Sequence, residues 1–241
     1  MAVSVEVNGA YATIALDRPD KLNALSLQLV EELAAAAERV AAEPEVTVVL
    51  VRGNGRSFCA GLDLDMFADQ GMPPGFYAAQ ERGFRRLETM DKIVIAAIHG
   101  HCLGGGVQLA AACDIRVAGA DAVLGLPAID EGLFPGMAPY RLPRLVGQGR
   151  AASLILSGRR LDALQALAIG LVDHVVEDLD GELTALAEVY ARAPRAAAAA
   201  SKRLMALSYD ASFDAVLAES ERLLEECLTA PEVQRARARR R

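Results

Sequence analysis

Two glycine-containing stretches carry the clearest chemical signal in this chain: residues 58–64, Phe-Cys-Ala-Gly-Leu-Asp-Leu, and residues 103–108, Leu-Gly-Gly-Gly-Val-Gln. Glycine lets a backbone turn sharply and approach a ligand without interference from a Cβ atom. The second stretch leads into an apolar segment, 107–113, and the first N–H groups of a helix there would have no partner inside it. Two such corners could aim N–H groups at one oxygen on which negative charge develops, which is worth roughly 3–4 kcal/mol per donor. Taken alone, each stretch is equally typical of an ordinary loop or turn.

The segments around these corners predict the elements that hold them in place. Apolar residues alternate near the N-terminus, which predicts a β-hairpin within residues 3–16. Residues 26–42 have helical spacing with Ser26 as the N-cap. Short apolar runs at 46–53 and 93–98 predict buried strands, and the helix over 107–113 follows the second of them.

The two corners belong to a longer series of motifs. The series comprises residues 18–25 (Arg-Pro-Asp-Lys-Leu-Asn-Ala-Leu), 58–64, 99–106 (His-Gly-His-Cys-Leu-Gly-Gly-Gly), 113–116 (Cys-Asp-Ile-Arg), 132–136 (Gly-Leu-Phe-Pro-Gly) and 168–173 (Ala-Ile-Gly-Leu-Val-Asp). In order and spacing it resembles the crotonase superfamily, the enoyl-CoA hydratase/isomerase fold, over roughly residues 3–205. The resemblance implies an α/β fold, with a crotonase-type ββα spiral core and a C-terminal helical segment. It also implies an acyl-CoA ligand and an oxyanion hole made by the backbone N–H groups of Ala60 and Gly105.

The chain departs from the family it resembles at two positions. Where those hydratases carry a catalytic glutamate three residues after the middle glycine, this chain has Gln108. Where a second glutamate follows the proline of the next loop, it has Ala128. Hydration of a conjugated double bond needs water activation and protonation of carbon, tasks normally split between two carboxylates. Gln108 can orient a water or the acyl chain but cannot accept a proton.

Two nearby acids, Asp130 and Glu131, are candidates to replace the missing glutamates. In an extended segment side chains alternate faces, so Asp130 would share the face of Ala128 and is the first choice. Glu131 is second, because a turn before Gly132 would break the alternation. The alternative interpretation is that both are solvated loop acids.

One carboxylate suffices for a 1,3-proton shift, which favours isomerase over hydratase chemistry. Acyl-CoA decarboxylation, thioester hydrolysis and a catalytically silent acyl-CoA-binding subunit are the alternatives. We therefore predict catalytic roles for Ala60, Gly105, Gln108, Asp130 and Glu131. Substrate contacts are predicted at Lys21, Ala24, Ala60, Asp63, Leu64, Gly104, Gly105, Ala128 and Lys202. Of these, Lys202 falls where a lysine of the family approaches a CoA phosphate, and Lys21 has a similar opportunity, although either can be a solvated charge.

Beyond residue 183 the sequence predicts three amphipathic helices, at 183–193, 194–207 and 212–228. We divide the chain into an acyl-CoA-binding core, 1–190, and a helical oligomerisation and CoA-covering segment, 191–241, since the resemblance implies homotrimers or hexamers. The basic tail 235–241 is predicted to be disordered rather than RNA-binding, because no aromatic residue interleaves it. Residues 68–76 are predicted to form a mobile flap at the pocket mouth.

Composition indicates an ordinary enzyme of the cytoplasm. The chain has 241 residues, 53% hydrophobic content and a net charge of −7, which disfavours nucleic acid as a partner. The four cysteines lack paired spacing and are expected to be free thiols. Neighbours in a strand face opposite sides, so His101 and Cys102 are poorly placed as a catalytic pair. We expect no metal site, no cofactor beyond the coenzyme A of the substrate, and no membrane span, even though residues 93–113 are uncharged apart from histidine.

Overall fold

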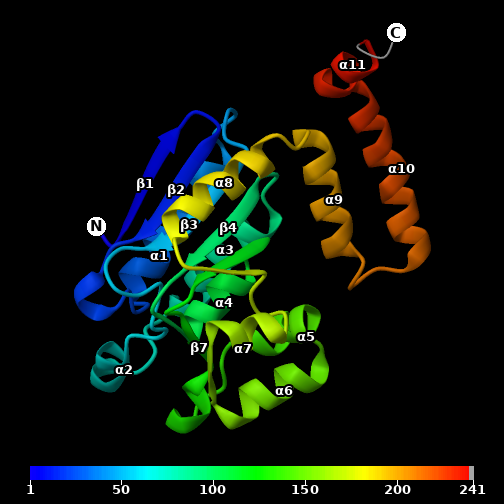
Figure 1. Cartoon of the computed structure of the whole chain (residues 1–241). Helices are drawn as coiled ribbons and strands as arrows, with labels where there is room; N and C mark the ends of the chain where they lie inside the picture. Colours follow the sequence, from blue (N-terminus) through cyan, green and yellow to red (C-terminus); the bar gives the residue numbers. More distant parts are fainter. Residues whose placement is uncertain (239–241) are drawn as a thin grey trace.

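The fold is built around the larger of two β-sheets. In this computed structural model, residues 1–238 are described, apart from the side chains at positions 70, 232, 235 and 236. Six strands pair in the order β1-β2-β3-β4-β6-β9. Their bounds are Val3–Asn8, Tyr11–Leu16, Val48–Gly53, Ile93–Ile98, Ile115–Gly119 and His174–Val176. Only β1 and β2 are antiparallel, and the other neighbours run parallel (Figure 1).

A smaller sheet continues the larger one at a sharp corner. Its strands are β5 (His101–Leu103), β7 (Val123–Gly125) and β8 (Arg160–Asp162). The chain passes from β4 into β5 through Gly100, whose φ of +52° lies in the left-handed region. A Cβ atom there would lie 2.1 Å from the carbonyl oxygen of Arg56, so only glycine fits this corner.

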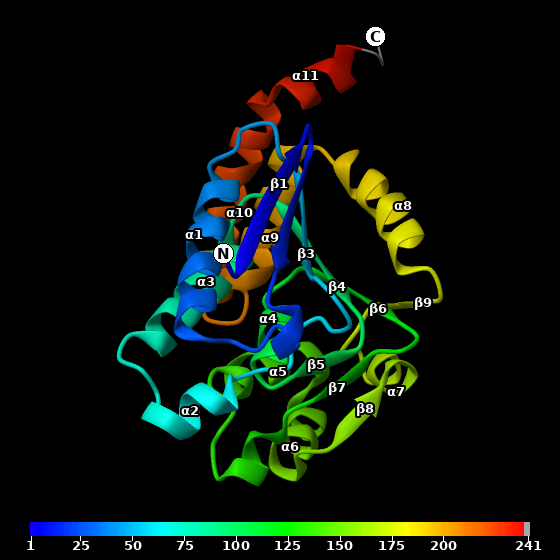
Figure 2. The ribbon, with the colours of Figure 1, turned by 90° about the vertical axis from the view of Figure 1, so that its left-hand side faces the viewer.

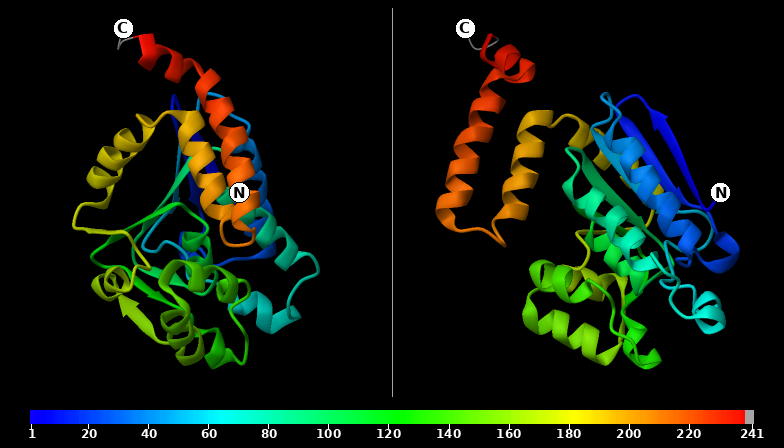
Figure 3. Two further views of the ribbon diagram at one scale, coloured as in Figure 1. Left: turned by 90° about the vertical axis from the view of Figure 1, so that its right-hand side faces the viewer. Right: turned by 180° about the vertical axis from the view of Figure 1, so that it is seen from behind.

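Helices cover both faces of the larger sheet. On one face α1 (Leu27–Ala41) and α3 (Phe76–Thr89) pack side by side (Figure 3). They approach closely because Gly83 faces the backbone of Ala34, which would lie 3.2 Å from any Cβ at that position. On the other face α8 (Leu179–Ala191) packs its Leu183 and Ala187 against strand residues such as Val48 and Ile95 (Figure 2).

The remaining elements surround the smaller sheet and the loops. They are the 3₁₀ helices η1 (Pro19–Lys21) and η2 (Pro127–Glu131), and the helices α2 (Leu64–Gln70), α4 (Gly105–Ala111), α5 (Ala138–Val146), α6 (Gln148–Ser157) and α7 (Ala163–Ala168). In Figure 1, α5, α6 and α7 lie together below the larger sheet. The central α4 starts directly after β5, as the glycine-rich turn predicts.

Several sequence predictions agree with this architecture. The N-terminal hairpin and the strand over 93–98 are present, and the Ser26 hydroxyl caps α1 by accepting a hydrogen bond from Leu29 N–H at 3.2 Å. The apolar run 93–113 forms β4, β5 and α4. Within the described chain, no helix has both the length and the apolar character needed to cross a membrane. The expected flap is shorter than predicted, because α2 extends to residue 70 and leaves only 71–75 as a loop.

Past α8 the chain is helical, with α9 (Arg195–Leu207), α10 (Phe213–Thr229) and α11 (Pro231–Ala238). The α9–α10 hairpin stands away from the sheet (Figures 1 and 3). Among the described residues of this hairpin only Leu223 is buried. The prediction of a disordered tail is wrong for 235–238, which continue α11, and 239–241 lie outside the described residues. The division at residue 190 falls in the last turn of α8 and stays a prediction.

Candidate active site

The two glycine corners predicted from the sequence are in direct contact. Cys59 forms an isolated β-bridge with Cys102 of β5 through the main chain. The Cys59 N–H donates to His101 O at 3.0 Å, and the Leu103 N–H donates to Cys59 O at 2.9 Å. A Cβ atom on Gly106 would lie 2.3 Å from Cys59 O. A Cβ atom on Gly61 would lie 2.7 Å from Leu103 O and 3.4 Å from Gly105 N. The close approach therefore depends on glycine on both sides.

At this contact the peptide N–H groups of Leu62 and Gly105 have no acceptor within residues 1–238. Gly105 opens α4, whose first-turn N–H groups point out of the helix. The Ala60 N–H instead donates to Leu22 O at 3.0 Å. This contact does not support Ala60 as an oxyanion donor, because its N–H is already occupied. The predicted site residue Gly104 supplies the turn, with φ +52° and its N–H bonded to Gly125 O at 2.9 Å.

Gln108 lies one turn along α4 from Gly105 and is only 4% exposed. Its Oε1 accepts a hydrogen bond from the Met137 N–H at 2.9 Å. Gly136 comes close on the same side, since a Cβ atom there would lie 3.1 Å from Gln108 Oε1 and 3.1 Å from Tyr77 Cε2. The side chain is thus held between the start of α5 and the first turn of α3.

The loop after β7 does not have the expected extended shape. Residues 127–131 form the 3₁₀ helix η2, in which residues three apart share a face. Ala128 is therefore aligned with Glu131, and the strand alternation on which the preference for Asp130 rested is absent. The Asp130 carboxylate faces the end of α6, where a Cβ on Gly158 would lie 3.3 Å from both its oxygens. Both acids are exposed.

The loop from residue 18 to 25 is tied to the first corner through Arg18. Its guanidinium pairs with Asp63 at 2.9 Å and donates to Ala24 O at 2.6 Å. Asp63 also caps α2 by accepting from Met66 N–H at 3.2 Å. Burial works to raise the pKa of the Asp63 carboxyl, but the hydrogen bonds from Arg18 and Met66 outweigh it and the pKa is lowered. Asp63 is thus structural, whereas its neighbour Leu64 is half exposed at 50%.

The two predicted lysines have quite different surroundings. Lys21 is exposed and pairs with Asp65 at 2.6 Å, and the hydrogen bond to that carboxylate raises the pKa of the Lys21 ammonium. Lys202 donates to Asp114 at 2.7 Å and to the carbonyl oxygens of Leu87 and Lys92, each at 3.0 Å. Its three donors are all used, so the structure does not support Lys202 as a CoA phosphate ligand.

The histidines and cysteines near the corner do not form a reactive group. Cys102 is buried, and burial raises the pKa of its thiol well above the ordinary value. His99 Nε2 contacts Gly55 O at 3.0 Å, on the loop side. Within the described residues no group of three or more His, Cys, Asp or Glu side chains could hold a metal. All four cysteines are free.

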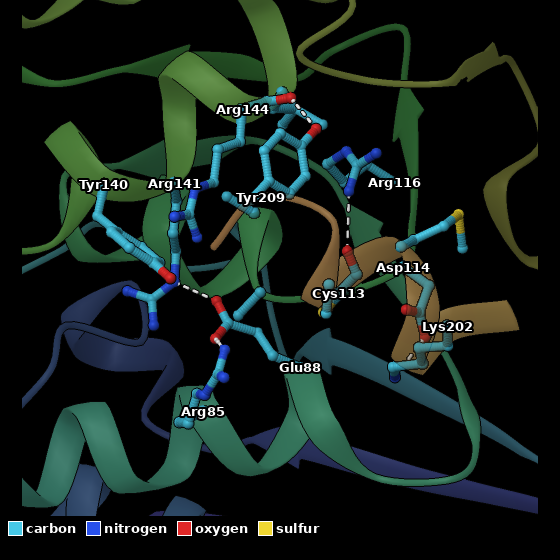
Figure 4. A pocket seen from close by; sticks show the side chains of 15 residues that line it. Arg85, Glu88, Cys113, Asp114, Arg116, Tyr140, Arg141, Arg144, Lys202 and Tyr209 are labelled. Carbon is cyan, nitrogen blue, oxygen red and sulfur yellow. Dashed lines mark hydrogen bonds and ion pairs between the residues drawn. The ribbon is translucent and has the colours of Figure 1, made fainter. Parts of the chain in front are cut away.

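A second polar region, at the other end of α4, was not predicted. It surrounds a cavity of about 290 Å³ lined by α3, α5 and α9 and the residues that follow α4 (Figure 4). Arg141 pairs with Glu81 at 2.8 Å and with Glu88, and Arg116 pairs with Asp173 at 2.7 Å. Burial raises the pKa of the Asp114 carboxyl, opposed by Lys202. The sequence feature that could have revealed this region is the presence of Arg116 and Arg141 inside otherwise apolar segments.

Comparisons with known proteins agree with the fold. Residues 6–239 match the sequence model of the Enoyl-CoA hydratase/isomerase family. A probable enoyl-CoA hydratase of Mycobacterium tuberculosis is 34% identical over 224 residues, covering 92% of this chain and 87% of the relative. A short-chain-enoyl-CoA hydratase of Clostridium acetobutylicum is 39% identical over 179 residues, covering 73% and 69%. The crystal structure of an enoyl-CoA hydratase from Thermoplasma volcanium superposes with a TM-score of 0.93 at 34% identity, covering 100% of this chain and 98% of that one.

The chain therefore belongs to the enoyl-CoA hydratase/isomerase family of the crotonase superfamily. The predicted class, α/β with a crotonase-type spiral core and a helical C-terminal segment, is confirmed. The protein is an enzyme of the hydratase/isomerase family, and an acyl-CoA substrate fits that membership.

Proposed function

We propose that the protein binds an acyl-CoA thioester and stabilises its enolate between the N–H groups of Leu62 and Gly105. The observation that carries this proposal is that two adjoining glycine corners bring together two peptide donors without acceptors. When a proton leaves the carbon next to the thioester, negative charge moves to the carbonyl oxygen. Donors already in place stabilise that charge by roughly 3–4 kcal/mol each.

As the reaction we propose double-bond isomerisation of an enoyl-CoA. A carboxylate removes a proton from carbon 2 of a 3-enoyl thioester, the electron pair moves onto the thioester oxygen, and the same carboxyl returns the proton to carbon 4. Glu131 is the proposed proton carrier, because η2 places it on the face of Ala128. Hydration is the less favoured reaction, since Gln108 and Ala128 provide no carboxylate pair to divide base and acid work.

A catalytically silent acyl-CoA-binding protein is the second candidate. The observation that favours it is the exposure of both Asp130 and Glu131, with Asp130 turned toward Gly158. A solvated carboxylate with an ordinary environment is a poor proton carrier unless the bound substrate covers it. Acyl-CoA binding without any proton exchange would distinguish this candidate from an isomerase.

We also propose a homo-oligomer in the cytoplasm that needs no cofactor beyond the substrate's coenzyme A. Support for association comes from large apolar side chains exposed on the α9–α10 hairpin, among them Met205, Phe213 and Leu224. Several large apolar side chains exposed on one helical hairpin are typical of an interaction surface. Multi-angle light scattering of the purified protein measures the assembly directly, and a monomeric mass would contradict it.

The test of the reaction uses deuterium. The protein is incubated in D₂O with butanoyl-CoA, whose carbon 2 can exchange, and with 3-enoyl-CoA and 2-enoyl-CoA, followed by mass spectrometry. We expect deuterium uptake and a shifted double bond for the wild type, lost in Glu131→Gln and retained in Asp130→Asn. No uptake by any thioester that binds would leave the silent binder as the function. Water addition after the single change Gln108→Glu would show that Ala128 does not limit hydration.

A further inference from the structure

The orientation of the Gln108 amide is fixed by a backbone group. The Met137 N–H can only donate, so the Gln108 atom that receives it at 2.9 Å must be the oxygen, Oε1. The amide nitrogen, Nε2, is left as a donor, and it meets no acceptor in the described part of the chain. Through Nε2, Gln108 therefore presents two N–H bonds to whatever lies beside that atom.

The donor lies close to the oxyanion corner. Gln108 follows Gly105 by three residues on α4, so the two share one helix face. Side chains on a helix lean toward its N-terminus, which brings the Gln108 amide toward the Gly105 N–H. The Tyr77 ring and Gly136 enclose the amide from the other side, and the residue is 4% exposed. Among the described residues no protein group satisfies Nε2, so a ligand with an acceptor oxygen can pair with it.

From this geometry we infer that Gln108 selects acyl-CoA thioesters that carry a second oxygen acceptor on carbon 3 of the acyl group. The inference rests on the enolate site of the proposed function, since it places the thioester oxygen between Leu62 and Gly105. It does not use the 3-enoyl reaction, because a carbon 3 that bears a ketone or carboxylate oxygen cannot also carry the double bond. One helical turn separates Gly105 from Gln108, so the partner of Nε2 belongs within a few atoms of the thioester carbon. A plain alkyl or alkenyl chain offers no acceptor there, whereas a ketone or a carboxylate does.

Ala128 supports the same substrate class. A glutamate at this position or at Gln108 would repel an acceptor oxygen, and the chain has neither. The two candidate acids of the loop are exposed, and Asp130 is directed toward Gly158. A ketone or carboxylate oxygen thus meets a donor in Gln108 and no opposing carboxylate at Ala128.

The test compares the binding of three stable probes by isothermal titration calorimetry: butanoyl-CoA, 3-oxobutanoyl-CoA and malonyl-CoA. We expect the wild type to bind at least one oxygenated probe about 10-fold or more tightly than butanoyl-CoA, as a well-made hydrogen bond allows. The ketone and carboxylate probes then show which acceptor is preferred. Gln108→Glu keeps the acceptor for Met137 N–H but removes the donor, and it should bring the preference to about 1-fold or below.

Two variants complete the design. Gln108→Met removes both functions of the amide and should also abolish the preference. Gln165→Glu makes the same chemical change at the exposed cap of α7 and should leave the preference intact. Melting temperatures verify that each variant is folded.

Every outcome is informative. Equal affinity of the wild type for all three probes would overturn the inference and leave the proposed function standing. A preference that survives in Gln108→Glu and Gln108→Met would show that another group creates it. Failure of every probe to bind would contradict the proposed function itself.

Discussion

The two ends of α4 differ in how their polar groups are satisfied. At the N-terminal end, the Gly105 N–H and the adjacent Leu62 N–H have no acceptor among residues 1–238. Just beyond the C-terminal end, Asp114 accepts from Lys202 at 2.7 Å, and Arg116 pairs with Asp173. The first end is built of backbone and glycine, the second of charged side chains.

This difference indicates that the N-terminal end of α4 can bind a ligand, whereas the charged end stabilises the fold. Unpaired donors in a preformed position lower the energy of a ligand that brings its own negative charge. Paired charges at the other end are already neutralised, so they can hold α3, α5 and α9 around α4 but have little left for a ligand. A cavity lined by cations is therefore not evidence of an anion site when each cation has its acid.

The largest expected effect is at the charged end. Arg141→Leu would leave the half-buried carboxylates of Glu81 and Glu88 without their shared partner, which should lower the free energy of unfolding by about 3 kcal/mol. Denaturation in urea measures it. Arg141→Lys should recover part of the loss, because one ammonium cannot reproduce both contacts. A loss below about 1 kcal/mol for the leucine variant would mean that the ion pairs do not support the fold.

At the glycine end, Gly106→Ala tests the contact between the corners. The added Cβ would meet Cys59 O at 2.3 Å, so the two donors must separate. We expect deuterium exchange of butanoyl-CoA to fall by a factor of about 100 or more, since a displaced oxyanion donor costs that much. Gly149→Ala in α6, where no atom lies within 4 Å of the new Cβ, is the control and should keep full activity. Unchanged exchange in Gly106→Ala would remove this contact from the mechanism.

Lys202→Met sharpens the comparison, because it tests whether the charged end binds substrate. Loss of three hydrogen bonds and an unpaired Asp114 should cost about 2 kcal/mol of unfolding free energy. Acyl-CoA affinity measured by calorimetry should stay the same, since the ammonium is fully used within the chain. Lys21→Met, at an exposed ion pair, should leave stability unchanged. A drop in affinity specific to Lys202→Met would restore it as a CoA ligand.

The smallest effect is expected for Asp63, next to Leu62. Its pKa is lower in the folded protein than in the unfolded chain, so the unfolded state binds the proton more readily and stability rises with pH across that interval. The contribution is complete above the unfolded value of about 4 and is lost as pH falls through the lowered folded pKa. Asp63→Asn retains the helix cap but not the charge, and should cost about 1 kcal/mol at pH 7.

The pH dependence of that variant provides the check. Wild type and Asp63→Asn should converge in urea-unfolding stability as the pH is lowered toward 3 or below, where the carboxyl of the wild type is protonated. A difference that remains constant down to that pH would mean that the Arg18 ion pair is not its source.

The sequence predicts the parts of the site that depend on residue type. Consecutive glycines indicate a close backbone approach, and Ser26 before an amphipathic run indicates a helix start, so both are found correctly. Which N–H group is left without an acceptor could not be predicted from the sequence, because it depends on hydrogen bonds between distant loops. The Ala60 N–H donates to Leu22 O, whereas the Leu62 N–H has no acceptor in the described chain. This difference follows from how the main chains of two loops are aligned, which the side-chain types do not reveal.

The same limit explains why the surroundings of Asp130 and Lys202 differ from those expected from the sequence. Four residues between Pro127 and Gly132 suit a 3₁₀ turn as well as an extended loop, and only the tertiary structure decides. A lysine in an alanine-rich helix has no sequence feature that distinguishes solvent from two carbonyl oxygens and Asp114. Hydrogen bonds to main-chain atoms cannot be predicted from the types of the residues alone.

The α9–α10 hairpin has a consequence for how the chain is synthesised. Its polar contacts with the earlier part of the chain join distant residues, such as Arg195 with Asp91 at 2.5 Å and Lys202 with Asp114, partners 104 and 88 residues apart. Strands β1 to β4 pair with their neighbours in sequence order, so they can assemble as soon as they leave the ribosome. The hairpin follows these strands in the sequence, so the surface on which it docks can already be folded when it is synthesised.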